Sequence, residues 1–428
     1  MSRFGGKMRR ALIVVSTWKP CMTADMQRAR LIAGELAGFG WEVEILAPDA
    51  SFQTDFSRVQ GAGMRFPDVP VHEAHQWRPE FFKRLGSRNV GIRAAVPVRR
   101  KGLALLRTRQ FDLVYFSTTQ HWLTCQGANW RRLTGVPYVA DLHDPVYSET
   151  KVGFVSRHRV KERIARRLGK NIERWALGRA DGLVSVSRGY ADDVARRNPA
   201  ARWLRTGARL VQPFPADTAT LDSSAASPSA SHRRVVYIGA GGSIMEKGWK
   251  ELLACLGELP VDSLPKFEIL GTDTNWRENQ RRDLEEAAKR AGLAGIVAEN
   301  PARIPYLDSI SITLGASGLL VLGVDDPNYR PSKLQTCIAT GLPLLVVLNA
   351  HSGLSQTLEQ SGPGVHVVKF GGREDSRASN KKAVAGFAED VAKGRKWGRS
   401  ERSFLTPDAA AQGHASLFDQ VLDTASSR

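Results

Sequence analysis

The sequence has little of what several classes of protein require. Its four cysteines, Cys21, Cys125, Cys255 and Cys337, are scattered without a C-x-x-C pair, which argues against a disulfide framework and a cysteine-based zinc site. No apolar run approaches the roughly 18–20 residues that span a bilayer. The apolar run at residues 11–15 is too short for a secretory signal and is expected to form a buried strand. We therefore expect a protein of the reducing cytoplasm.

Several catalytic and binding motifs are also missing. No spacing of His, Cys and Asp residues matches a metal-ligand set, so no metal site is predicted. The G-x-S-x-G nucleophile motif and the Walker A sequence do not occur. There is no basic–aromatic stacking pattern and no DNA- or RNA-binding motif, so nucleic acid is not an expected partner.

Positive charge is abundant but confined to the first half of the chain. Residues 1–216 hold 37 Lys and Arg against 18 Asp and Glu, a net charge of +19, whereas the remainder carries −1. Residues 88–109 and 157–170 concentrate the excess. The asymmetry indicates an anionic partner for this half, either an anionic membrane surface, with the protein peripheral at its inner face, or a lipid-linked acceptor. Alternatively, each helix packs an apolar stripe on the sheet and keeps its charges in water.

The order of the elements predicts two α/β domains. A length of 428 residues favours two cores, and apolar runs alternate with helical patterns, which is typical of parallel sheets. We predict two Rossmann-like doubly wound domains facing each other across a cleft. The predicted boundaries are an N-terminal domain at 8–216, a linker at 217–234, a second domain at 235–400, and a C-terminal helix at 401–428 that crosses back to the first domain.

The individual strands are predicted from short apolar runs. They lie at residues 11–15, 42–46, 111–116, 138–141, 182–186, 235–239, 267–270, 318–322 and 342–347.

A glycine-rich turn follows the first strand of the second domain. In Val236-Tyr-Ile-Gly-Ala-Gly-Gly-Ser243 the turn precedes a helix that begins near Lys247. Gly239, Gly241 and Gly242 would let backbone amides approach a phosphate, and Lys247 would add charge. A structural turn without a ligand fits the pattern almost as well.

A second stretch also points to an anion. Pro331-Ser-Lys-Leu334 precedes a helix, and a lysine near a helix N-terminus is electrostatically unfavourable unless an anion is bound there. Ser332 and Lys333 are therefore predicted to bind an anion. A solvated surface lysine is the alternative.

A histidine follows a buried strand of the first domain. In Asp141-Leu-His-Asp-Pro145 the polar residues stand at the carboxyl end of the strand, where ligands of doubly wound sheets bind. We predict catalytic roles for His143 and Asp144. A histidine that is hydrogen-bonded for structure only is the alternative.

These residues together resemble the family 4 retaining glycosyltransferases of GT-B fold. The resemblance covers nearly the whole chain. It lies in Thr134-Gly-Val-Pro-Tyr-Val-Ala-Asp141 and Arg179-Ala-Asp-Gly-Leu-Val-Ser-Val-Ser187 of the first domain, and in Pro331-Ser-Lys-Leu334, typical of one subgroup, in the second. The closest likeness is to members with patterns similar to Pro301-Ala-Arg-Ile-Pro-Tyr306 and Asp325-Asp-Pro-Asn-Tyr329.

The resemblance implies sugar transfer from a nucleotide diphosphate sugar to a lipid-linked or polysaccharide acceptor, with retention. The second domain would bind the nucleotide-sugar donor, with the phosphates near residues 241–247 and 332–333 and the ribose near Thr336. The first domain would be the acceptor side, and His143 would lie near the donor sugar. No cofactor and no catalytic metal are implied. Three departures stand out. The two glutamates of the family fall on Asn328 and Thr336, its arginine at the glycine-rich turn falls on Ala240, and its Asn-Gly-Val-Asp reads Phe214-Pro-Ala-Asp217. A non-catalytic GT-B-like module that binds a sugar nucleotide or acts as a scaffold therefore remains a second interpretation.

Overall fold

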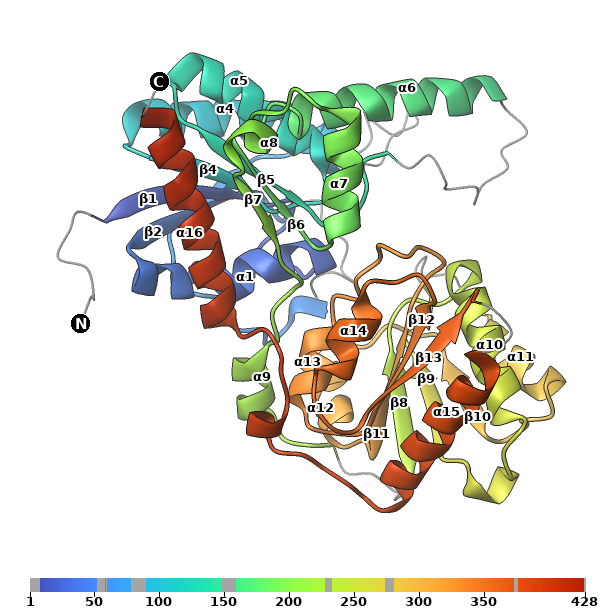
Figure 1. Cartoon of the computed structure of the whole chain (residues 1–428). Helices are drawn as coiled ribbons and strands as arrows, with labels where there is room; N and C mark the ends of the chain where they lie inside the picture. The colour runs from blue at the N-terminus through green and yellow to red at the C-terminus, as the bar shows by residue number, and fades with distance from the viewer. Residues whose placement is uncertain are drawn as a thin grey trace. The chain divides into compact units, whose positions relative to one another are not determined.

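The computed structural model describes residues 8–51, 58, 60–77, 90–147, 159–227, 233–273, 281–372 and 376–426. They form two compact units, each built on one parallel sheet (Figure 1). The first unit comprises residues 1–61, 65–214 and 407–428, and the second comprises 62–64 and 215–406. The predicted class of two Rossmann-like doubly wound domains is confirmed.

The first unit has a seven-stranded sheet in the order β3-β2-β1-β4-β5-β6-β7. Its central strands are apolar throughout, and all four residues of β4 are buried, as parallel strands covered on both faces must be. The strands are β1 (Arg9–Val14), β2 (Trp41–Pro48), β3 (Val71–Ala74), β4 (Leu113–Phe116), β5 (Tyr138–Leu142), β6 (Gly182–Ser185) and β7 (Arg209–Val211).

Helices cover both faces of this sheet. The helices α4, α5 and α6 pack in one row, and α1 and α16 contact each other in another (Figure 1). Their bounds are η1 (Ala24–Met26), α1 (Gln27–Ala33), η2 (Glu35–Phe39), α4 (Val90–Thr108), α5 (His121–Thr134), α6 (Arg159–Ala176), α7 (Arg188–Arg197), α8 (Arg202–Thr206) and α16 (Pro407–Ser426).

The second unit has a six-stranded sheet in the order β10-β9-β8-β11-β12-β13. The strands are β8 (Arg234–Ile238), β9 (Lys266–Leu270), β10 (Val297–Asn300), β11 (Gly318–Leu322), β12 (Leu344–Asn349) and β13 (Val365–Phe370). The helices are α9 (Thr218–Ser223), η3 (Ser243–Met245), α10 (Glu246–Leu256), η4 (Val261–Ser263), α11 (Asp283–Arg290), α12 (Tyr306–Leu314), α13 (Leu334–Ala339), α14 (Leu354–Glu359), α15 (Ser376–Ala392) and η5 (Arg399–Glu401).

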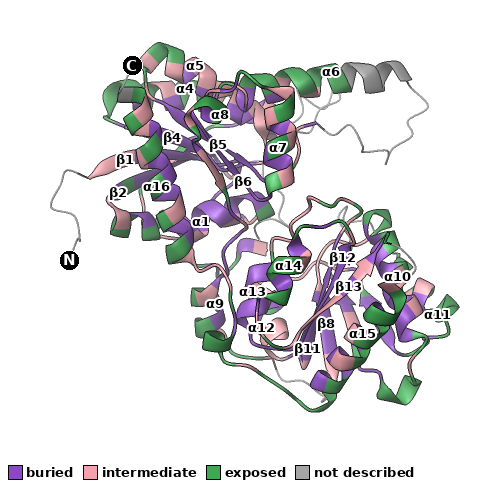
Figure 2. Ribbon diagram, in the orientation of Figure 1, coloured by how far each residue is buried: buried purple, intermediate pink, exposed green. Residues whose placement is uncertain are grey.

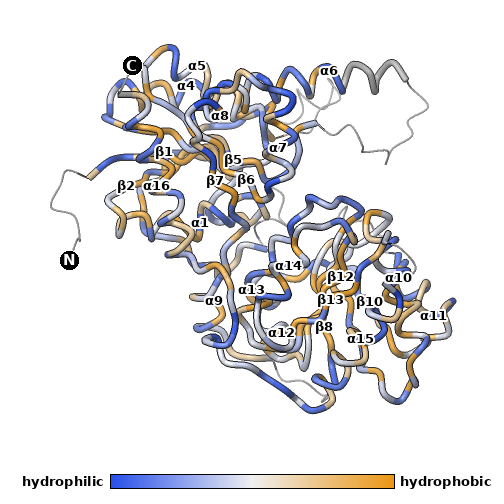
Figure 3. Tube along the Cα trace, in the orientation of Figure 1, coloured by the Kyte–Doolittle hydropathy of each residue, from blue (hydrophilic) through white to orange (hydrophobic). Residues whose placement is uncertain are grey.

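Each sheet lies in the apolar interior of its own unit. The strands are largely buried (Figure 2) and carry the most hydrophobic residues (Figure 3). In both sheets the strand order reverses beside the first strand, between β1 and β4 and between β8 and β11. Ligands of such sheets bind outside the carboxyl ends of the strands at this point. The described helices include none long and apolar enough to cross a bilayer.

The predicted linker and the predicted C-terminal helix both contain helical structure. The stretch 217–234, which the composition indicated to be a linker, contains α9. Asp217 caps this helix by accepting a hydrogen bond from the amide of Thr220 at 3.2 Å, and Leu221 is buried. The last helix, α16, belongs to the first unit and buries Ala411, Phe418 and Val421.

Candidate functional site

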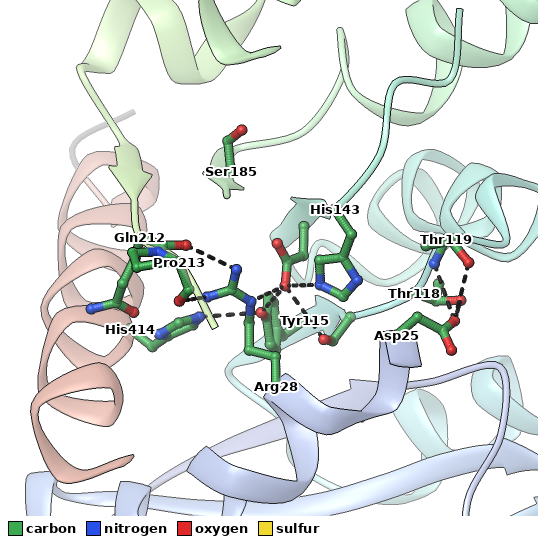
Figure 4. Close-up of polar contacts among 12 residues, drawn as sticks. Asp25, Arg28, Tyr115, Thr118, Thr119, His143, Ser185, Gln212, Pro213 and His414 are labelled. Atoms are coloured by element: carbon green, nitrogen blue, oxygen red, sulfur yellow. Dashed lines mark hydrogen bonds and ion pairs between the residues drawn. The ribbon is translucent and has the colours of Figure 1, made fainter. Parts of the chain in front are cut away.

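A buried carboxylate organises the polar residues at the carboxyl edge of the first sheet (Figure 4). Asp141 lies near the end of β5 with no exposed side-chain area. Its Oδ2 accepts a hydrogen bond from the Tyr115 hydroxyl at 2.6 Å and lies 2.9 Å from the Arg28 Nε. Burial alone would raise the pKa of Asp141, but Arg28 and His143 hold it well below its ordinary value. Asp141 is therefore an ionised carboxylate inside the protein.

Arg28 on α1 supplies the compensating charge and is itself fully buried. Its Nη1 donates to the carbonyl of Pro213 at 3.0 Å and its Nη2 to the carbonyl of Gln212 at 2.9 Å. The guanidinium carbon lies 4.8 Å from the centre of the Phe214 ring. Arg28 thus connects Asp141 to residues 212–214, where the chain leaves the first unit.

His143 is held by the same carboxylate. Its Nε2 lies 2.6 Å from Asp141 Oδ2, and its ring packs 4.9 Å from the ring of Phe214. The Nδ1 atom is buried and has no hydrogen-bond partner in the described part of the chain. A neutral ring that donates from Nε2 to Asp141 carries its lone pair on Nδ1. His143 can therefore accept a hydrogen bond or a proton from a ligand.

Asp144 was predicted to be catalytic together with His143. Asp144 is exposed, and the carboxylate that binds the histidine is Asp141. In extended backbone, residues two apart share a face, so the D-x-H spacing itself could have indicated this pair.

A second histidine completes the chain of contacts from α16. His414 is fully buried, with Nδ1 2.8 Å from the carbonyl of Ala410 and Nε2 3.2 Å from the Tyr115 hydroxyl. Desolvation, reinforced by Arg28, lowers the pKa of His414 to about 4. The ring is therefore neutral at physiological pH. Its position 299 residues from Tyr115 left no signal in the local sequence.

His121, the first residue of α5, is a third histidine near this cluster. It hydrogen-bonds the backbone of Asp144. Desolvation and the charge of His143 lower the pKa of His121 to about 4. Like His414, it remains neutral near pH 7.

Asp25 joins the loops that follow β1 and β4, at the point where the strand order reverses. Its Oδ2 accepts hydrogen bonds from the hydroxyl of Thr118 at 3.1 Å and the amide of Thr119 at 3.2 Å (Figure 4). It also accepts one from the hydroxyl of Ser16 at 2.6 Å. Thr23 donates to its other oxygen at 2.6 Å. The edge of the site is thereby held rigid by a buried carboxylate.

In the second unit, the glycine-rich turn packs tightly on its neighbours. A Cβ on Gly239 would lie 2.7 Å from the Tyr237 hydroxyl, and one on Gly241 would lie 2.7 Å from Thr272. Gly242 has φ +95°, which favours glycine. Local packing therefore accounts for these glycines without a ligand.

The amides of the same turn nevertheless leave room for an anion. Those of Gly239 and Gly241 donate to the carbonyls of Leu270 and Thr272, both at 3.0 Å. Within the described ranges, the amides of Ala240, Gly242 and Ser243 have no acceptor. Successive free amides of this kind are suited to binding a phosphate.

Lys333 lies beside this turn. Its Nζ donates to the carbonyl of Ile238 at 2.9 Å. The side chain remains accessible to solvent, yet the surrounding protein desolvates the ammonium and lowers the pKa of Lys333 to about 8, with Arg303 contributing. Helix α13 begins after Lys333 but has only six residues, so its dipole adds little and the sequence argument from a helix N-terminus loses weight.

The other predicted donor contacts are engaged in different ways. Lys247 is exposed and forms an ion pair with Asp325. The Thr336 hydroxyl accepts from the amide of Asp217 at 3.1 Å, which ties α13 to the start of α9. Ser332 has no hydrogen bond with the described residues. Among those residues, no group of three His, Cys, Asp or Glu gathers as metal ligands.

Residues 26–207 match the family described as "Glycosyl transferase 4-like domain". The matched stretch covers most of the first unit. The match includes Arg28, Tyr115, Asp141 and His143 of the buried cluster, whereas His414 lies outside it.

Two curated relatives are similar in sequence to part of this chain. A 2-deoxystreptamine glucosyltransferase of Streptomyces kanamyceticus is 28% identical over 185 residues, which is 41% of this chain and 44% of the relative. A 2-deoxystreptamine N-acetyl-D-glucosaminyltransferase of Streptomyces fradiae is 27% identical over 270 residues, 57% of this chain and 60% of the relative. The chain thus spans about half the length of the curated relatives that it matches.

A solved structure resembles nearly the whole chain in its fold. The Anabaena protein HepE, in complex with UDP-glucose, aligns with a TM-score of 0.57 and 16% identity, covering 98% of this chain and 100% of HepE. This likeness concerns the fold, which is of the GT-B class as the sequence predicted.

Proposed function

We propose that this protein is a nucleotide-sugar glycosyltransferase that moves a hexose-type sugar, with retention, from a nucleoside diphosphate to an acceptor. The observation that carries the proposal is the buried His143–Asp141 pair with an open Nδ1, placed inside a glycosyl transferase 4-like domain. The names of the two relatives, a glucosyltransferase and an N-acetylglucosaminyltransferase, support hexosyl transfer.

The chemistry assigns a separate task to each unit. Transfer breaks the bond between the anomeric carbon of the sugar and a phosphate oxygen, so negative charge develops on the leaving diphosphate. In the second unit, Lys333 and the amides of Ala240 and Gly242 would stabilise that charge without a metal. In the first unit, His143 would bind a sugar hydroxyl through Nδ1. The acceptor hydroxyl forms the new bond to the anomeric carbon, and its proton passes to the leaving diphosphate.

The first test combines donor binding with turnover. A thermal-shift screen of nucleotide sugars should reveal the donor, because a ligand at 100 times its Kd stabilises by about 2.7 kcal/mol. With that donor, His143→Gln should lower the rate of sugar transfer about 10–100-fold, as expected for a lost hydrogen bond to the donor sugar. The affinity for the nucleoside diphosphate should stay the same, because the proposed phosphate contacts lie in the second unit.

The matched control is His366→Gln, which removes another histidine–aspartate pair, that with Asp390 at 2.8 Å, and should transfer at the wild-type rate. Unchanged transfer by His143→Gln would remove this residue from catalysis. Tight donor binding by the wild type without transfer or hydrolysis would instead favour the non-catalytic module, in line with the departures at Asn328 and Thr336.

The acceptor is proposed to be anionic, lipid-linked or polysaccharide, and reached at an acidic membrane surface. The net charge of +19 on residues 1–216 supports this. On α6, Leu168 is 45% exposed rather than packed on the sheet, among the exposed Arg166, Arg167 and Lys170. Arg157 lies outside the described residues, as do the side chains of 159–165.

A second basic and apolar surface lies at the edge of the same sheet. A cavity of about 490 Å³ at the end of β3 has both apolar and basic side chains in its lining and one acidic side chain. The lining residues are Glu73, Ala74, His75, Trp77, Val96, Pro97, Arg100 and Lys101. Side chains of both kinds are needed to hold an anionic amphiphile, because an acidic headgroup attracts basic residues while apolar ones contact the acyl region.

Vesicle sedimentation tests the membrane proposal. The protein should bind vesicles with acidic lipids at low salt and release at high salt, because such attraction is screened within a Debye length. Arg166→Gln with Arg167→Gln should weaken binding several-fold, since each basic residue near acidic lipid contributes about 1 kcal/mol. Lys381→Gln with Lys382→Gln, which removes the same charge from the second unit, is the control. Equal binding to acidic and zwitterionic vesicles would contradict the proposal.

A further inference from the structure

The motif Pro301-Ala-Arg-Ile-Pro-Tyr306 has no role in the function described so far. It connects β10 to α12 and lies against the end of β9 through two reciprocal hydrogen bonds. The amide of Asp273 donates to the carbonyl of Pro301 at 3.1 Å, and the Nε of Arg303 donates to the carbonyl of Asp273 at 2.8 Å. The carbonyl of Asp273, in the loop that follows β9, therefore holds the Nε of Arg303 at the carboxyl edge of the sheet.

The two terminal nitrogens of the Arg303 guanidinium are available to a ligand. Its Nη1 and Nη2 make no hydrogen bond or ion pair with the residues that the structure describes. Desolvation lowers the pKa of Arg303, and the charges of Tyr237 and Asp273 counteract this. An arginine always remains charged in a protein, so a desolvated guanidinium with a free fork is suited to an oxyanion.

Arg303 lies near the other anion-binding groups of this edge. Its charge contributes to lowering the pKa of Lys333, which itself donates to the carbonyl that precedes the glycine-rich turn. Arg303 also interacts electrostatically with Tyr237, whose hydroxyl donates to the carbonyl of Ala240 at 2.5 Å. Lys333, Arg303 and the three free amides are thus brought to the same edge of the sheet, where the charge of Asp273 also acts on Arg303.

We propose that Arg303 binds the diphosphate of the donor through Nη1 and Nη2, as a second cation opposite Lys333, and thereby selects nucleoside diphosphates over monophosphates. The inference rests on the proposed function for the identity of the donor. One phosphate has enough partners in Lys333 and the turn amides. The second phosphate needs another cation, and position 240 carries alanine.

Arginine suits this task better than lysine would. Its planar fork can give two parallel hydrogen bonds to one phosphate while Nε keeps its bond to Asp273. Arg303→Lys retains the positive charge. Its single ammonium group cannot bind the Asp273 carbonyl and also give two parallel hydrogen bonds to a phosphate. The geometry of binding, and not the charge alone, therefore decides the selectivity.

Isothermal titration with inorganic pyrophosphate, and with UDP, GDP, ADP and their monophosphates, tests the proposal. Arg303→Gln should weaken pyrophosphate and the bound nucleoside diphosphate about 10–100-fold, as expected for a lost charged hydrogen bond. The affinity for the matching monophosphate should change less than about threefold. Arg303→Lys should fall between the wild type and Arg303→Gln. Lys333→Ala should abolish diphosphate binding and weaken the monophosphate as well.

Arg290→Gln, which removes an exposed charge from α11, is the matched control and should bind like the wild type. A merely structural Arg303 would weaken mono- and diphosphate alike, and that result would overturn the proposal. So would unchanged diphosphate affinity in Arg303→Gln, or a wild type that binds neither pyrophosphate nor any nucleoside diphosphate. Selective loss of diphosphate binding in a protein that transfers no sugar would support the role of Arg303 and refute the proposed function.

Discussion

Asp141→Asn is expected to destabilise the protein by about 3–5 kcal/mol, because it leaves the buried charge of Arg28 without its carboxylate. Arg28→Met should cost a similar amount, since it strands Asp141 and removes the donors to two carbonyls. The double variant should be clearly more stable than the sum of the single losses indicates, because neither charge is then left alone. Chemical denaturation of the four proteins measures this cycle.

Glu246→Gln provides the comparison for this cycle. It removes one partner of the exposed pair Lys250–Glu246 and should leave the denaturation midpoint unchanged, since exposed pairs contribute little. Additive losses in the buried pair would mean that Asp141 and Arg28 are stabilised independently, and the charge compensation described above would be wrong.

Acid is expected to destabilise the protein well above the range in which carboxylates titrate. The pKa values of His414 and His121 are lowered to about 4 in the folded protein, whereas an unfolded histidine titrates near about 6.5. Between these values the unfolded chain binds more protons, so stability is full above about pH 6.5 and is lost as the pH falls towards 4. Two such groups give a slope of up to about 2.7 kcal/mol per pH unit.

Denaturation midpoints measured from pH 7.5 to 4.5 test this dependence. His414→Gln, which can keep both hydrogen bonds without titrating, should reduce the slope by about half. His75→Gln, at a largely exposed position, should leave the slope as it is. An unaltered slope in His414→Gln would show that this buried ring does not control the acid sensitivity.

The strands that sequence patterns missed are the four at the sheet edges. β3, β7, β10 and β13 end the two sheets, and their side chains are partly exposed, as in Val-His-Glu-Ala of β3. Central strands such as β4 and β12 are buried on both faces and stand out as unbroken apolar runs. An edge strand lacks that signal, because its stability comes from pairing with one neighbour that is distant in the sequence.

The residues of the candidate site divide in the same way: some can be predicted from the local sequence, and others only from contacts with distant residues. His143 was found because the carboxyl end of a buried strand can be recognised in the sequence. Arg28 and His414 were not, because a buried charge or ring reveals itself only through partners far along the chain. Arg303 belongs to a motif that was noticed, yet its free fork depends on the carbonyl of Asp273 in a neighbouring loop.

The position of α16 affects how the chain folds as it leaves the ribosome. The first unit is discontinuous, since its chain departs after residue 214 and returns at 407. Until α16 emerges, Trp41 and Tyr115 lack the aromatic contacts of Phe418, and Tyr115 lacks that of His414. The second unit, nearly all of it contiguous, is complete earlier in translation. Although its synthesis begins first, the first unit reaches its final packing after the second, because its apolar face depends on the 20 residues of α16.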